Sequence, residues 1–127
     1  MASPPLAGWP IEEIPDQDRL FMRVHRIFVS QGKLAPGVFR DHGGGMSTDW
    51  ERYSTAAETL RRAAAPSNNG VIQLVAASVS AIARLTVEHT PIVSNRAHAD
   101  VFGEKTTEVR LRLKRVAHWA ILPSELL

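Results

Sequence analysis

The sequence contains no cysteine. Disulfide bonds, thiolate metal sites and cysteine nucleophiles are therefore excluded, and a reducing compartment suits the chain. Apolar runs of the roughly 20 residues that a membrane-spanning helix needs are also missing. The N-terminal segment MASPPLAGWPIEEIP lacks the basic stretch and the unbroken apolar stretch of a secretory signal. We therefore expect a cytoplasmic protein with no membrane partner.

An excess of charge of one sign is also lacking. The chain has 15 basic and 13 acidic residues, which gives a formal net charge of +2. A domain that binds duplex nucleic acid concentrates many basic side chains on one face, and only the stretch 110–115 is dense in them. Nucleic acid is therefore an alternative without support. We expect the partner to be another protein or a second copy of the chain.

The length of 127 residues, with 44% hydrophobic and 22% charged residues, is typical of one globular domain. Four of the first fifteen residues are proline, which excludes helix and sheet interior from that segment. We expect an extended arm over residues 1–15 and a single domain over residues 16–127. Trp9 gives the arm an apolar anchor that suits either its own domain or a partner surface.

Hydrophobic patterns predict strands near Leu20, Val71, Val87 and Ala97. The segment 20–29 also fits a helix, but its β-branched and aromatic residues favour a strand. A capping-box spacing and helix-favouring residues predict a helix over about residues 56–65, and the three glycines at 43–45 predict a flexible turn. We therefore expect an α+β fold in which a small, mainly antiparallel sheet packs against two helices.

The last segment has two competing periods. EVRLRL alternates as a strand does, whereas Val109, Leu113 and Ala117 belong to a helical stripe. We predict a helix over about residues 107–121. Leu111 and His118 then lie opposite the core stripe, so we expect them, together with Trp9, to form an interface.

The segment VEHTPIVSNRAHADVFG, residues 87–103, carries the main candidate site. It has two strand-like pieces joined by a short turn, so His89 and His98 are expected to lie close together, near Asp100. Imidazoles can move protons near neutral pH, and cations stabilise charge on phosphate oxygens. The predicted catalytic residues are His89, His98, Asp100 and Lys105, and the predicted ligand-binding residues are Arg23 and His25.

The histidines lack the spacing of a metal site, so we expect no metal and no cofactor. A structural interpretation of the same residues remains open. In it, His98 and Asp100 are hydrogen-bonded sheet residues and His89 caps a turn.

A second candidate site follows the order of a basic residue, a hydroxyl residue and a glutamate. That order is similar to the one in ADP-ribosyltransferase-like folds, which implies a glutamate that activates the nucleophile and earlier residues that hold NAD. The glutamate of those folds comes much later in the chain than Glu58. Glu58 also completes the capping box that begins at Thr55. The residues concerned are Arg23, His25, Ser47, Tyr53 and Glu58.

The segments MSTDWERYST, VEHTPI and NRAHADVFGEKTTEVRLRL resemble those of an uncharacterised group of small bacterial proteins. The resemblance covers about residues 20–121 and implies kinship without an activity. The sequence favours a non-catalytic interaction or accessory module. The alternative is a metal-independent enzyme that acts on a phosphate-containing or nucleotide substrate through histidine, lysine and arginine side chains.

Overall fold

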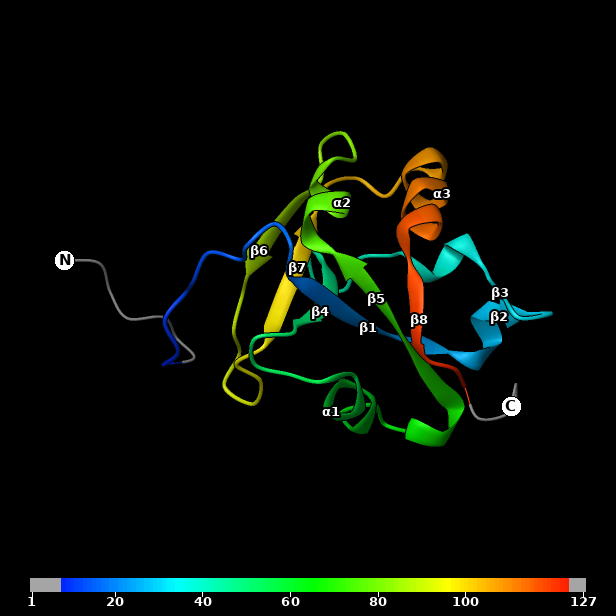
Figure 1. Cartoon of the computed structure of the whole chain (residues 1–127), viewed down its shortest axis with the longest axis horizontal. Coiled ribbons are helices and arrows are strands. Elements are labelled where there is room, and N and C mark those ends of the chain that lie inside the picture. The colour runs from blue at the N-terminus through cyan, green and yellow to red at the C-terminus, as the bar shows by residue number, and fades with distance from the viewer. Residues whose placement is uncertain (1–7, 124–127) are drawn as a thin grey trace.

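A computed structural model describes residues 8–123 of the chain (Figure 1). Its main element is a six-stranded sheet with the order β6-β7-β4-β1-β5-β8, in which all neighbours are antiparallel. The strands are β1 (Arg19–His25), β4 (Met46–Trp50), β5 (Asn69–Val75), β6 (Thr86–His89), β7 (His98–Phe102) and β8 (His118–Ile121). The predicted α+β class is confirmed.

Three α-helices accompany the sheet: α1 (Ala56–Arg61), α2 (Ala76–Ser80) and α3 (Thr107–Val116). In Figure 1, α2 and α3 lie on one side of the sheet and α1 lies on the other. The strands β2 (Val29–Ser30) and β3 (Lys33–Leu34) form a separate two-stranded ladder. Short 3₁₀ turns complete the described chain: η1 (Arg26–Phe28), η2 (Pro36–Val38) and η3 (Pro66–Asn68).

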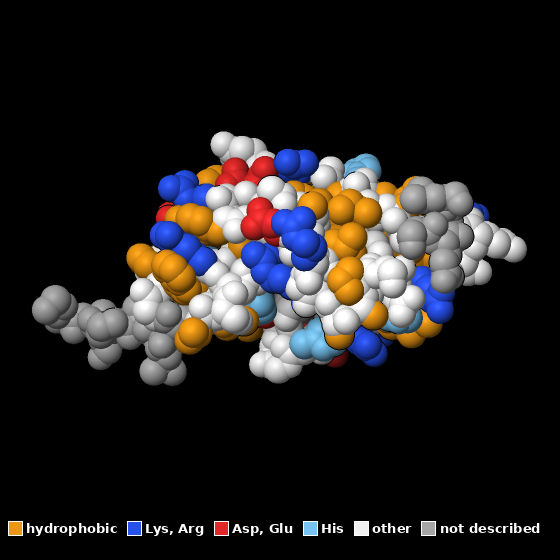
Figure 2. Space-filling model, turned by 90° about the horizontal axis from the view of Figure 1, so that it is seen from below, with side chains coloured by type: hydrophobic (Ala, Val, Ile, Leu, Met, Phe, Trp, Pro, Cys, Tyr) orange, Lys and Arg blue, Asp and Glu red, His pale blue; other side chains and the backbone are white. Residues whose placement is uncertain are grey.

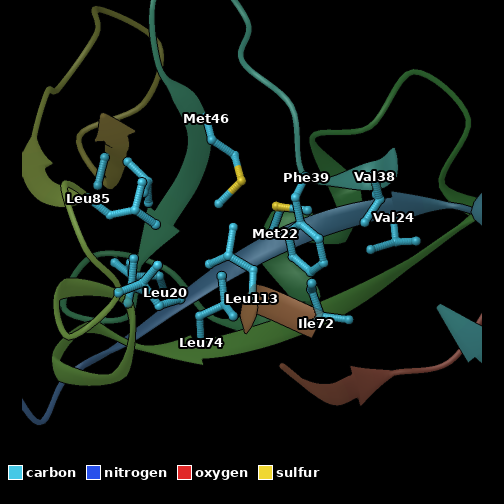
Figure 3. Packing of buried hydrophobic residues seen from close by; sticks show 14 of the residues in the cluster. Leu20, Met22, Val24, Val38, Phe39, Met46, Ile72, Leu74, Leu85 and Leu113 are labelled. Atoms are coloured by element: carbon cyan, nitrogen blue, oxygen red, sulfur yellow. The ribbon is translucent and has the colours of Figure 1, made fainter. Parts of the chain in front are cut away.

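The hydrophobic core lies between the sheet and the pair α2 and α3 (Figure 3). Because side chains alternate along a strand, β1 sends Leu20, Met22 and Val24 to this side. Ile72 and Leu74 of β5 do the same, and other elements complete the cluster with Phe39, Trp50, Val79 and Leu113. The residues between them in β1, Phe21 and Arg23, face the side of α1.

The four strands expected near Leu20, Val71, Val87 and Ala97 are present, as is the helix that begins after Thr55. That helix is shorter than predicted and ends at Arg61. The flexible turn predicted at the glycines is confined to residues 42–45, where the His42 amide donates to the Gly45 carbonyl at 2.7 Å. Strand β4 begins directly after it and was missed.

The predicted helix over residues 107–121 was wrong beyond Val116. Ala117 is extended, with φ −80° and ψ 139°, and His118–Ile121 form the edge strand β8. The helical stripe continued by coincidence into a segment that alternates His, Trp, Ala and Ile. Pairing with β5 gives this backbone a ladder of hydrogen bonds, which outweighs the local helical pattern.

The described part of the proline-rich arm, residues 8–15, forms neither helix nor strand. It lies along the domain, because the Glu12 amide donates to Nδ1 of His89 at 3.0 Å and Ile14 packs against the core. Ile11 points outward and is 67% exposed. The first part of the expected arm, residues 1–7, lies outside the described residues.

Candidate functional site: a basic cleft beside His98

A cleft of about 570 Å³ opens where β1 and β4 part. These strands pair only through Leu20 with Trp50 and Phe21 with Asp49, although both continue beyond that point. The floor of the cleft comes from β1, β4 and β7. Its walls come from α1, from the segment 38–42 and from the loop between β6 and β7.

The charge of the cleft is mainly positive. Its lining includes Arg23, Arg40 and Arg62 against the single carboxylate of Asp49. His42 adds a titratable side chain. Figure 2 views the molecule from the side of α1, and basic and histidine side chains lie together near the middle of that face. An anionic ligand is therefore the kind that this cleft favours.

His98 is held in one orientation at the edge of the cleft. Its Nδ1 atom lies 2.9 Å from the carbonyl oxygen of Thr90 and 3.1 Å from the Thr90 hydroxyl. That hydroxyl donates to Oδ2 of Asp100 at 2.8 Å. A carbonyl can only accept, so Nδ1 carries the proton. Asp100 itself lies 3.9 Å from Nδ1 and acts on the ring mainly through Thr90.

The other ring nitrogen of His98 meets a hydroxyl group. Nε2 lies 3.3 Å from Oγ of Ser47. In the neutral ring the single proton is on Nδ1, so in that form Nε2 has a free lone pair and accepts from the serine hydroxyl. Histidine, serine and an orienting partner therefore stand in the order that general base catalysis requires.

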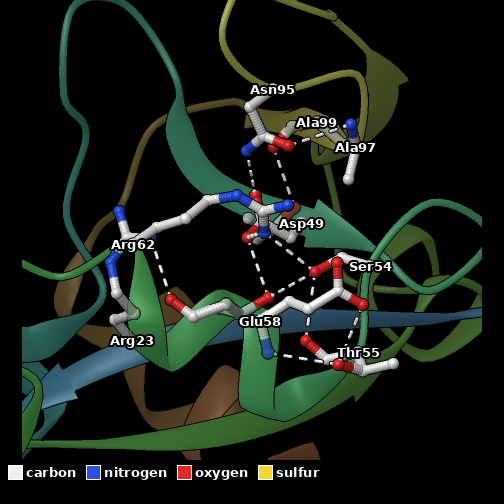
Figure 4. Close-up of polar contacts among 11 residues, drawn as sticks. Arg23, Asp49, Ser54, Thr55, Glu58, Arg62, Asn95, Ala97 and Ala99 are labelled. Carbon is white, nitrogen blue, oxygen red and sulfur yellow. Dashed lines mark hydrogen bonds and ion pairs between the residues drawn. The ribbon is translucent and has the colours of Figure 1, made fainter.

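Next to this pair, Asp49 is the centre of a buried polar network (Figure 4). Its Oδ2 accepts from the Thr59 hydroxyl at 2.8 Å and from Nη1 of Arg62 at 2.9 Å, and its Oδ1 accepts from the Asn95 amide at 2.7 Å. The network joins β4, α1 and the loop between β6 and β7. It fixes two of the three walls, α1 and this loop, to the floor of the cleft.

The structure separates His89 from His98. The two strands are neighbours, as expected, but His89 pairs with Ala99 and points to the core face, whereas His98 points to the cleft. Nδ1 of His89 accepts from the Glu12 amide, and Nε2 donates to the Arg96 carbonyl at 2.7 Å. With both nitrogens occupied inside the protein, His89 has a structural role.

Lys105 and His25 also lie outside the lining of the cleft. Lys105 is buried, and its ammonium group donates to Asp41 at 2.7 Å and to the carbonyls of Val101 and Gly103. His25 caps η1 by accepting from the Ile27 amide. Of the predicted ligand-binding pair, Arg23 alone reaches the cleft.

The transferase-like set is not assembled either. Arg23 and Ser47 line the cleft, but Tyr53 and Glu58 do not. Tyr53 donates to the carboxylate of Glu12, and Glu58 is bound to the Thr55 hydroxyl at the start of α1. Glu58 is therefore a capping residue.

The three predicted interface residues lie on different elements. Trp9 is partly buried in the arm, where the guanidinium of Arg96 lies 5.0 Å from its ring centroid. Leu111 is exposed on α3, and His118 is exposed on β8. Since α3 ends between them, they do not share one helix face.

Within residues 8–123, no group of three or more His, Asp or Glu side chains could hold a metal ion. None of the helices in the same range has the length and apolar character to cross a membrane.

Sequence reasoning missed Asp49, Arg62, Asn95 and the partnership of Ser47 with His98. The signal that could have found two of them is the alternation in MSTDW, where Ser47 and Asp49 occupy one face of a strand. The neighbouring glycines directed the interpretation to a turn.

Comparisons with protein-family models, with curated proteins and with solved structures find no match for the chain.

Proposed function

We propose that the protein is a metal-independent enzyme that acts on a small phosphate-containing substrate in this cleft. His98 serves as general base and then as general acid. One observation carries the proposal: an imidazole with its Nδ1 proton fixed by Thr90 turns its basic nitrogen toward a hydroxyl in a cleft that three arginines line.

The arrangement supports this chemistry in two ways. Because Nε2 of His98 is the free base, it can take a proton at the moment when the nucleophile attacks. Arginine side chains remain charged at all working pH values, and their planar groups match phosphate oxygens. A volume of about 570 Å³ suits a ligand of nucleotide size.

The test is hydrolysis of nitrophenyl phosphate mono- and diesters and of nucleotides, in the presence of a chelator. We expect turnover that falls about 100-fold or more in His98→Gln, with an unchanged melting temperature. His118→Gln is the matched control, since this histidine is exposed on β8 outside the cleft. Absence of turnover over the whole panel, or equal loss in both variants, would contradict the proposal.

A second candidate function is interaction with another protein or with a second copy of the chain. The arm and the loop between β6 and β7, which the ion pair of Glu12 with Arg96 connects, both carry exposed apolar side chains: Ile11 is 67%, Ile92 45% and Val93 77% exposed. Sedimentation of the wild type and of Val93→Asp tests self-association. A monomer in both cases would exclude that version. For either function we propose a location in the bacterial cytoplasm.

A further inference from the structure

We propose that Ser47 is the nucleophile of this site and carries the phosphoryl group as a covalent intermediate. The role of His98 as base rests on the proposed function, and the identity of the nucleophile goes beyond it. A histidine of this kind can instead activate a water molecule. The two alternatives differ in whether a covalent phosphoserine forms, and this difference can be measured.

Ser47 differs from the other hydroxyl residues of the cleft lining. The Thr48 hydroxyl donates to the Ala99 carbonyl at 2.8 Å, and the Thr59 hydroxyl donates to Asp49 at 2.8 Å. Both protons are therefore committed to acceptors inside the protein. Ser94 is exposed on the loop between β6 and β7. Ser47 alone among these four donates to the basic nitrogen of a histidine.

Both members of the pair are carried by paired strands. Ser47 of β4 is directly opposite Asp100 of β7, and Asp49 is directly opposite His98. The distance between Oγ and Nε2 is therefore set by the ladder between two inner strands of the sheet, and flexible loops do not determine it. Thr90 then fixes the rotation of the imidazole.

The arginines of the cleft supply the charge that a phosphoryl group requires. Arg23 uses Nη1 in a 3.3 Å contact with the Thr59 carbonyl, and Arg62 uses Nη1 toward Asp49 and Ser54. A guanidinium has five N–H donors, so each keeps donors for oxygens of the substrate. Their positive charge stabilises the negative charge that develops during transfer.

The reaction balances with water as the only co-reactant. Oγ of Ser47 attacks phosphorus, and its proton passes to Nε2 of His98. The new bond between Oγ and phosphorus forms as the bond from phosphorus to the ester oxygen breaks, and the departing alcohol takes the proton from His98. Water then attacks the phosphoserine, gives its proton to His98, and releases phosphate as Ser47 regains a proton.

An alkyl fluorophosphonate tests the nucleophile without knowledge of the substrate. We expect one phosphonate on the intact protein, mapped to Ser47, and none on Ser47→Ala. Labelling should be about 100-fold slower in His98→Gln. Ser80→Ala is the matched control, because it removes an exposed serine of α2 that lies outside the cleft, and it should be labelled as fast as the wild type.

A second variant tests the same inference even if Ser47→Ala does not fold. Since the chain has no cysteine, Ser47→Cys introduces its only thiol. We expect iodoacetamide to alkylate this thiol faster than the thiol introduced by Ser94→Cys, although position 94 is the more exposed, and His98→Gln should remove the difference. Equal rates would overturn the inference.

The outcomes separate this inference from the proposed function. Suppose that His98→Gln loses phosphate-ester hydrolysis, that Ser47→Ala retains it, and that the wild type takes no label. That result would overturn Ser47 as the nucleophile and leave water in that role. Labelling of Ser47 without hydrolysis of any phosphate ester would support the nucleophile and overturn the proposed substrate.

Discussion

Asp49 of β4 and His98 of β7 are directly opposite each other, and their side chains leave the sheet on the same face. Asp49 is occupied by Thr59, Arg62 and Asn95. It therefore fixes α1 and the loop between β6 and β7 to the floor of the cleft, while His98 remains directed at Ser47. Under the proposed function, these two adjacent polar residues have different tasks: Asp49 holds the structure together and His98 is the base.

Replacement of Asp49 should destabilise the fold. Asp49→Ala leaves the buried Thr59 and Asn95 groups without their acceptor, so we expect a loss of about 2 to 3 kcal/mol in the free energy of unfolding. Asp49→Asn keeps one acceptor oxygen and should lose less. Urea denaturation measures both. Equal stability of Asp49→Ala and the wild type would show that the network contributes nothing.

The start of α1 gives a second stability prediction. The Glu58 amide donates to the Thr55 hydroxyl oxygen at 3.1 Å, and that hydroxyl lies 3.1 Å from Oε1 of Glu58. Thr55→Ala combined with Glu58→Ala should cost about 1 to 2 kcal/mol, the usual contribution of an N-terminal cap. Phosphate-ester turnover should stay at the wild-type level. A loss of turnover at unchanged stability would return Glu58 to the list of functional residues.

The sequence was sufficient for elements with a strong local pattern. Alternation predicted the strands near Leu20 and Val87, and the Thr55 cap predicted the start of α1. Prediction from the sequence failed where the deciding contact is with a segment far away along the chain. Strand β8 is an example, because its backbone hydrogen bonds are made with β5. A local pattern records which faces are apolar, but it does not record the neighbour that a strand will acquire.

The site was predictable only in part, because a local pattern shows which face a side chain occupies and not which strand lies beside it. The segment 87–103 predicted a site with His98 near Asp100, and these two residues do share one face of β7. Ser47, the partner of His98, lies 51 positions away along the chain. Only the register between β4 and β7 brings them together, and no property of either segment alone specifies that register.

His89 provides a contrast with His98. It is buried, its two nitrogens are bonded to backbone groups, and its ring lies 5.1 Å from that of Trp50. His89→Ala should therefore lower the free energy of unfolding by about 1 to 3 kcal/mol, because polar partners are left unpaired. Turnover per folded molecule should not change. Chemical denaturation and an assay at a temperature well below the transition measure the two quantities, and a selective loss of turnover would contradict the structural role.

Acid should weaken the attachment of the arm. A hydrogen bond from Tyr53, followed by the charges of Arg52 and Arg96, lowers the pKa of Glu12 from its usual 4.5. A lowered pKa in the folded state means that this carboxylate stabilises the fold above pH 4.5, and that the contribution is lost as the pH falls from there through the folded-state pKa.

Stability measured against pH tests this assignment of Glu12. The decline below pH 4.5 should be less steep in Glu12→Gln than in the wild type, with Tyr53→Phe between them. Identical slopes in all three proteins would show that this carboxylate does not couple the arm to the domain.

Gly45 gives a test of how His98 is positioned. A Cβ atom at this residue would lie 2.8 Å from Cβ of Asp100, closer than real Cβ contacts come. Gly45→Ala should therefore displace the Asp100 carboxylate, which holds the Thr90 hydroxyl against the imidazole. We expect slower fluorophosphonate labelling of Ser47 with the protein still folded, because the imidazole loses its fixed rotation. Gly37→Ala is the matched control, since a Cβ there meets no atom within 4 Å. If Gly45→Ala were labelled as fast as Gly37→Ala, Asp100 would have no part in orienting His98, and the Thr90 carbonyl alone would be sufficient.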